Sequence, residues 1–276
     1  MIRDLILRYA GLVLSCAVFF AGFTACGADQ YGVPVDEDPE QEKKVVRANP
    51  NVRKAGSSGF GIHATRGWIA TPIPYRVGAG LDAEQSTALH TAILQWEWAC
   101  GKQLFSFEGI HQGTSGDSFS DLYSSLADEI TGNYNNADWK KTGKPMYVLA
   151  TTVWKNDQES GAITRADVRY NTETYIIGDS LTLHDTDEKD VVDMHSLALH
   201  ELGHLLGLAH VSASADRYSI MNPTLYVGEG LTSRELSRGD ITRLQKIYGC
   251  SGKACDVDGL LAEGFPAPAP NEKENR

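Results

Sequence analysis

The eleven-residue stretch HELGHLLGLAH constrains this chain more than any other feature of its sequence. Residues four apart lie on one face of a helix, so His200 and His204 present their imidazoles one turn apart. Two imidazoles in this arrangement can bind one Zn²⁺, and Glu201 beside them can hold a water and accept its proton. The pattern therefore predicts a helix that carries half of a zinc site.

A zinc ion that performs chemistry needs a third protein ligand and one open coordination position. His210 lies too far along to share the helix face with the first two histidines. Gly207 can take a left-handed conformation that ends the helix, and the chain can then turn back to bring His210 to the metal. The alternative is an ordinary buried helix that contains histidines by chance. A chance match becomes far rarer when the pattern must also include Gly207 and His210.

The spacing HExxHxxGxxH resembles the long zinc signature of the metzincin metalloendopeptidases. The segment RYSIMNPT places Met221 eleven residues after His210, and it resembles the methionine-bearing turn of the matrixin branch. Val211 follows His210 where astacins usually have Glu, adamalysins Asp, serralysins Pro and matrixins Ser, so another branch stays open. The resemblance implies that Zn²⁺ is held by His200, His204 and His210, with Met221 below the metal.

The implied activity is hydrolysis of peptide bonds by a metal-activated water, with Glu201 as the general base and a peptide or protein as substrate. The alternative from a different class is a catalytically silent exported lipoprotein whose zinc is structural and whose role is binding. Glu201 separates the two, because a structural site needs no carboxylate beside its first histidine.

The resemblance implies an α+β catalytic domain over residues 68–250, with a twisted mixed sheet, an edge strand for substrate, the active-site helix and a C-terminal helix. A capping box of Asp82 and Gln85 begins the first expected helix, which Gly101 ends. The other expected elements are an edge strand at 68–77, strands at 104–110, 146–155 and 162–171, a short helix near 121–130, and helices at 191–206 and 237–249.

Matrixins bind an extended substrate along an edge strand that precedes the zinc helix, and the segment 146–155 resembles it. Unpaired backbone groups on such an edge let a peptide add as a further strand. Arg169 stands where the resemblance implies a histidine of a second, structural zinc site, which argues against that site. Calcium ligands remain possible at Asn171, Glu173 or the acidic stretch 184–190.

The N-terminus is expected to be a targeting segment. An apolar run at residues 9–23 follows two arginines and ends at FTAC, which resembles a bacterial lipobox with Cys26 as the lipidated residue. Cys16 is the weaker candidate, and an uncleaved anchor is the alternative. We expect a signal at 1–26 and a polar linker or short pro-segment at 27–67. The protein is then exported and lipid-anchored to the outer membrane or cell surface, or else periplasmic or secreted.

Three cysteines, Cys100, Cys250 and Cys255, remain outside the expected signal and lipid site. Export permits one disulfide, and we predict that Cys100 pairs with Cys250 or Cys255, although a local Cys250–Cys255 bridge is the alternative. The net charge of −11 and the absence of a basic patch argue against a nucleic-acid partner. Residues 251–276 are expected to be a disordered tail, and the protein a monomer.

Overall fold

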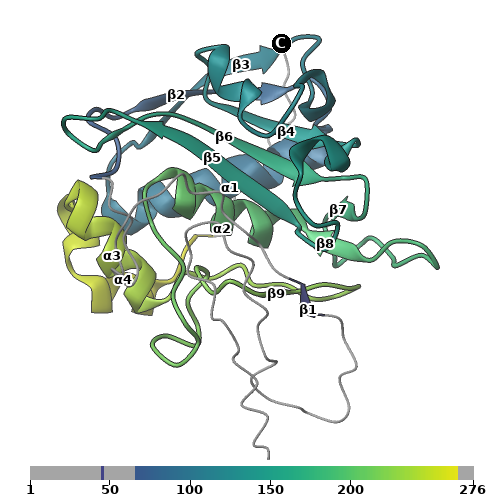
Figure 1. Ribbon diagram of the computed structural model, residues 1–276. Coiled ribbons are helices and arrows are strands. Elements are labelled where there is room, and N and C mark those ends of the chain that lie inside the picture. The colour runs from purple at the N-terminus through teal and green to yellow at the C-terminus, as the bar shows by residue number, and fades with distance from the viewer. Residues whose placement is uncertain (1–44, 47–65, 267–276) are drawn as a thin grey trace, which may run out of the picture.

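The computed structural model describes residues 45–46 and 66–266, and its centre is a five-stranded sheet (Figure 1). The strands lie in the order β3-β2-β4-β6-β5; four run parallel, and β5 runs antiparallel to β6. Their bounds are β2 Ile73–Gly78, β3 Phe105–His111, β4 Gly132–Asn136, β5 Ala150–Asn156 and β6 Ile163–Asn171. A mixed sheet with helices packed on it confirms the predicted α+β class.

Two long helices, α1 (Ala83–Cys100) and α2 (Met194–Leu205), lie side by side below this sheet in Figure 1. The predicted capping box begins α1, because Asp82 accepts the Gln85 N–H and the Gln85 side chain accepts the Asp82 N–H. Gly101 ends the helix in the left-handed conformation, with φ 66°. The main core lies between these helices and the sheet.

The chain closes with α3 (Arg238–Tyr248), a 3-10 turn η4 (Gly252–Cys255) and α4 (Val257–Glu263). The last helix expected in the domain at 68–250 is confirmed as α3, and the Ser237 side chain caps it. The prediction of a disordered tail is wrong for α4, which begins at the Asp256 cap and buries Leu260. Residues 267–276 lie outside the described part of the chain.

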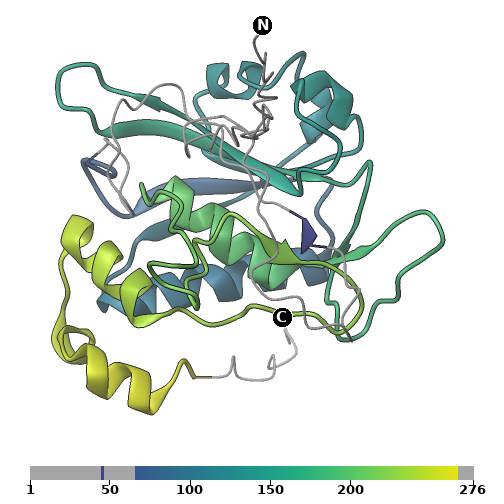
Figure 2. The same cartoon turned by 60° about the horizontal axis from the view of Figure 1, so that its bottom comes forward.

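Smaller elements complete the fold. Strands β7 (Ile176–Gly178) and β8 (Val191–Asp193) pair in parallel before α2, and 3-10 turns lie at η1 Gly116–Ser118, η2 Ser124–Ala127 and η3 Trp139–Thr142. Strand β9 (Leu225–Tyr226) pairs antiparallel with β1 (Val45–Val46), and Figure 2 shows the pair next to α2. Part of the expected linker thus lies against the domain expected at 68–250.

The expected signal, Cys16 and Cys26 lie outside the described residues. Among the helices of the described part, none combines the length and the apolar character that a bilayer span requires.

The strand expected at 68–77 was predicted to lie at an edge, and this is wrong: β2 lies between β3 and β4. Pro74 is tolerated there because, at its position, β2 pairs with β3 but not with β4. Ile73 donates its N–H toward β3, so the missing N–H of Pro74 would face β4, which pairs only at Arg76 and Val77.

The predicted disulfide from Cys100 is also wrong, because Cys250 pairs with Cys255. Cys100 is fully buried at the end of α1 as a free thiol. Its backbone is close to the bridge, since its carbonyl accepts the Ser251 N–H at 2.9 Å. The turn η4 brings the two other cysteines together with their Cα atoms 5.2 Å apart, which is within the usual range for a disulfide.

Candidate metal centre

Helix α2 is a buried platform for the first two histidines. Nearly every residue of the helix is buried, including Leu197, Leu202, His200 and His204. Asp193 caps its first turn by accepting the Ser196 N–H at 2.9 Å, and Arg234 pairs with the same carboxylate. A helix packed on all sides and capped in this way holds its side chains in fixed positions.

The helix ends where the sequence predicted. Gly207 takes a positive φ of 98°, a conformation that strains other residues. Two distant side chains satisfy the last carbonyls: the Trp68 indole donates to Leu205 O at 2.8 Å, and the Tyr248 hydroxyl donates to Leu206 O at 2.8 Å. The chain can therefore turn sharply without leaving these buried carbonyls unpaired.

This turn brings the three histidines together. The Nε2 atoms of His200 and His204 lie 3.0 Å apart, and those of His200 and His210 lie 3.2 Å apart. Within the described residues, these three form the one group of three or more His, Cys, Asp or Glu side chains with converging ligand atoms. The structure therefore assembles all three residues that the sequence predicted as zinc ligands.

The other ring nitrogens show which atoms face the centre of the group. His200 Nδ1 lies 2.7 Å from Ile220 O, and His204 Nδ1 lies 2.7 Å from Leu208 O. A carbonyl oxygen can only accept, so each Nδ1 carries a proton, and in a neutral ring Nε2 then carries a lone pair. Burial lowers the pKa of His200 to about 4, which keeps that ring neutral.

Facing lone pairs at 3.0 Å cannot form a hydrogen bond, and they repel unless a cation lies between them. Imidazole nitrogens oriented by carbonyl acceptors are the usual ligand set of zinc in proteins. The donor set thus fits a Zn²⁺ ion.

Glu201 lies beside this group in a fully buried position. Thr152 on β5 donates its hydroxyl to Glu201 Oε2 at 2.6 Å, while Oε1 has no hydrogen-bond partner. Burial raises the pKa of Glu201 to about 8, and the Thr152 hydrogen bond opposes that rise. A nearby cation would favour the carboxylate form, in which the unpartnered oxygen can accept a proton.

Met221 is fully buried against the backbone of α2. A Cβ added to Gly203 would lie 2.3 Å from the Met221 sulfur, so the two residues are in direct contact between the first two histidines. Any side chain at position 203 would displace the methionine or the helix. Met221 therefore packs against the part of α2 that joins His200 to His204.

Comparison with known proteins agrees with this geometry. Residues 83–249 match the matrixin family. The chain belongs to the matrixin family. The match extends from α1 to the end of α3 and includes every residue of the histidine group.

The relatives match this chain over short segments. Metalloendoproteinase 2-MMP of Arabidopsis thaliana is 42% identical over 60 residues, which is 22% of this chain and 15% of that protein. Matrilysin of Felis catus is 41% identical over 63 residues, 23% of this chain and 22% of that protein. High choriolytic enzyme 1, a hatching enzyme zinc-protease from Oryzias latipes, has a TM-score of 0.32 and 12% identity, covering 72% of this chain and 99% of its own. The matched segments of the two sequence relatives span less than a quarter of their length.

This matrixin carries a buried arginine where the resemblance implies a second zinc site. Arg169 is fully buried and donates to Gly116 O and Asp121 O at 2.7 Å each, and to the Asn136 side chain. The guanidinium therefore joins three segments of the chain by hydrogen bonds.

The proposed calcium ligands are engaged elsewhere. The Asn171 amide donates to Met146 O and Val148 O, and Glu173 forms an ion pair with Lys140 at 2.7 Å. In the acidic stretch, Asp185 accepts the N–H groups of Val191 and Glu229. Within the described residues, no Asp or Glu side chain belongs to a cluster of three or more potential metal ligands.

Sequence reasoning missed several residues that shape the site, namely Thr152, Gly203, Leu208 and Ile220. Gly203 lies inside the zinc signature, and a glycine within a buried helix is itself a signal of close packing. Leu208 also lies inside the signature, but it acts through its backbone carbonyl, which its side-chain identity does not reveal. Thr152 and Ile220 act from separate segments, and nothing in the local sequence marks them.

Proposed function

We propose that this matrixin is a zinc-dependent endopeptidase in which His200, His204 and His210 hold the metal. The observation that carries the proposal is the convergence of three imidazoles, with the outer nitrogens of two held by carbonyls, next to a buried carboxylate with one unpartnered oxygen. A bound zinc ion would polarise the scissile carbonyl and lower the pKa of a water molecule.

The chain's own residues then supply proton transfer and alignment. Glu201 Oε1 accepts a proton from the attacking water and returns it to the nitrogen of the leaving peptide. Thr152 fixes the other carboxylate oxygen, which leaves Oε1 to face the reaction. Ile220 O and Leu208 O hold His200 and His204 in the tautomer that binds metal. Met221 supports the helix from below.

An extended peptide is proposed to bind along β5, which pairs with β6 alone among the described strands. The Asn171 N–H donates to Leu149 O, so that carbonyl faces β6, and by alternation the backbone groups of Ala150 and Thr152 face away from the sheet. The strand that orients Glu201 thus also has backbone groups that point away from its partner strand, where a substrate strand could add.

The purified chain should contain one zinc ion, and His204→Ala should lose it, because two histidines cannot hold zinc as tightly as three. Metal analysis after dialysis measures this. His195→Ala is the matched control, since His195 belongs to the same helix but contacts Gln95. Full zinc content in His204→Ala, or its loss in His195→Ala alone, would contradict the assignment.

We also propose that the protein is exported and held at a membrane by lipid on Cys26. Support comes from the apolar run at 9–23 that ends at FTAC. Cys26→Ser should abolish incorporation of labelled lipid, whereas Cys16→Ser should retain it. Mass spectrometry that finds an unlipidated protein beginning at Met1 would show that the segment is an uncleaved anchor.

A further inference from the structure

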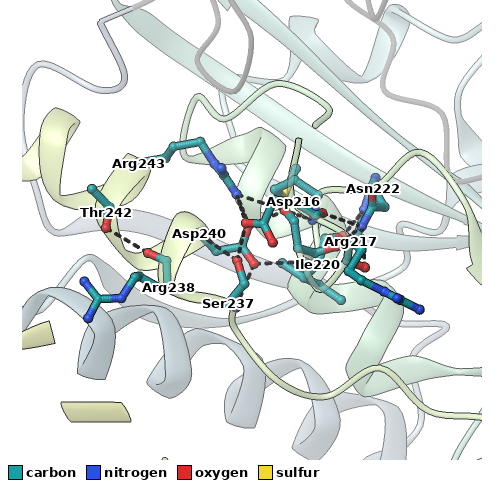
Figure 3. A network of polar contacts seen from close by, with 12 residues as sticks. Asp216, Arg217, Ile220, Asn222, Ser237, Arg238, Asp240, Thr242 and Arg243 are labelled. Atoms are coloured by element: carbon teal, nitrogen blue, oxygen red, sulfur yellow. Dashed lines mark hydrogen bonds and ion pairs between the residues drawn. The ribbon is translucent and has the colours of Figure 1, made fainter. Parts of the chain in front are cut away.

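The loop that contains Met221 is tied to helix α3 by one buried carboxylate. Asp240 has no exposed surface and accepts four hydrogen bonds. Its Oδ2 accepts the N–H groups of Ile220 and Ser237 at 2.9 Å each, and its Oδ1 accepts the Ser219 hydroxyl at 2.5 Å and an Arg243 N–H at 2.6 Å. Figure 3 shows Asp240 between the loop and Arg243.

The contacts of Asp240 with Ser237 and Arg243 lie within α3 and its cap. Asp240 is the third residue of α3, and with Ser237 it forms a capping box. Helix capping needs only the Ser237 contacts. The bonds to Ser219 and Ile220 are additional, and they join the helix cap to a loop about twenty residues earlier in the chain.

Ile220 connects this carboxylate to the metal centre. Its N–H is held by Asp240, and its carbonyl oxygen lies 2.7 Å from Nδ1 of His200. Ser219 extends the contact, because its hydroxyl donates to Asp240 and accepts the Met221 N–H at 3.0 Å. One carboxylate therefore fixes both the carbonyl that orients a histidine and the methionine below it.

Arg243 keeps this carboxylate in place. Its guanidinium bridges Asp240 and Asp216, and Asp216 also accepts the Ser237 hydroxyl at 2.7 Å. Arg243 is only partly buried, with 15% of its side chain exposed, so it shields Asp240 from solvent and supplies the opposite charge.

We propose that Asp240 is a positioning residue for the metal centre, acting through Ile220 on His200, an inference that rests on the zinc site proposed above. Groups that orient metal ligands from the second layer typically change metal affinity about 10- to 100-fold when they are removed. Asp240→Ala should therefore weaken zinc binding by about 10- to 100-fold. Asp240→Asn should recover part of this loss, because its amide oxygen can still accept the Ile220 N–H.

The measurement is a chelator competition that gives the zinc dissociation constant of the full-length chain, together with the unfolding temperature of the metal-free protein. Asp82→Ala is the matched control, because it removes the capping carboxylate of α1, which accepts the Gln85 N–H and has no other side-chain hydrogen bond among the described residues. It should lower the unfolding temperature and leave zinc affinity unchanged. Arg243→Gln, which leaves Asp240 in place, should weaken zinc binding in the same direction but less.

The outcomes separate the possible roles. If Asp240→Ala does not fold, Asp240→Asn and Arg243→Gln decide, and unchanged zinc affinity in both overturns the proposal. If Asp240→Ala folds with lower stability and unchanged zinc affinity, Asp240 only caps the helix, and the proposal fails while the zinc site stands. If the wild type itself binds no zinc, the zinc site fails, and this inference fails with it.

Discussion

Glu201→Gln should reduce peptide cleavage by about 10²- to 10⁴-fold, the usual loss when a general base is removed. Glutamine keeps the shape of the side chain and an oxygen that can accept the Thr152 hydroxyl. It replaces the proton acceptor at Oε1 with an amide group that cannot take a proton. Zinc content should remain at the wild-type level, because the carboxylate lies beside the metal ligands and is not one of them.

The stability of the metal-free variant provides a control. Burial raises the pKa of Glu201 from 4.5 to about 8, so ionising it costs the wild-type fold free energy as the pH rises through that interval. The amide does not ionise, and the variant should be at least as stable as the wild type at pH 8. Equal cleavage by both proteins would leave the fold intact and remove Glu201 from the mechanism.

Arg169→Met should lower the free energy of unfolding by about 3–5 kcal/mol, because it leaves several buried acceptors unpaired. The guanidinium joins the segment around Gly116 and Asp121 to Asn136 on β4. Methionine fills part of the same volume but donates no hydrogen bond. Denaturant unfolding with the metal chelated measures the difference.

Arg165→Met on the same strand is the matched control. Arg165 forms an ion pair with the exposed Glu129, and surface ion pairs contribute little to stability. Its replacement should therefore change the free energy of unfolding far less. If the two variants lose equal stability, the buried network around Arg169 does not hold this part of the fold together.

The elements predicted well are those whose signals are local. Capping boxes at Asp82 and Ser237 and the glycines that end helices are read within one turn of chain, and these helices were confirmed. The zinc signature is equally local, because the helix and the turn at Gly207 bring its histidines together without help from the sheet.

The features that were missed depend on contacts between distant segments. Strand β4 has the sequence GNYNN, which argues against a buried strand by composition. It is buried because Asn133 accepts the Tyr170 hydroxyl and Asn136 accepts Arg169. The disulfide was mispredicted for a similar reason, since only packing decides that the Cys100 thiol points into the core.

The most direct test of the central claim is the cleavage of casein by the purified chain loaded with one equivalent of zinc. The account predicts that cleavage is lost with a chelator, returns when zinc is added, and is absent in His204→Ala. The same assay is run on a form without residues 27–60, because this segment includes β1, which pairs with β9 of the domain. If neither zinc-loaded form cleaves casein or any member of a broad peptide library, the protein is a silent zinc-binding domain, and the proposed activity is wrong.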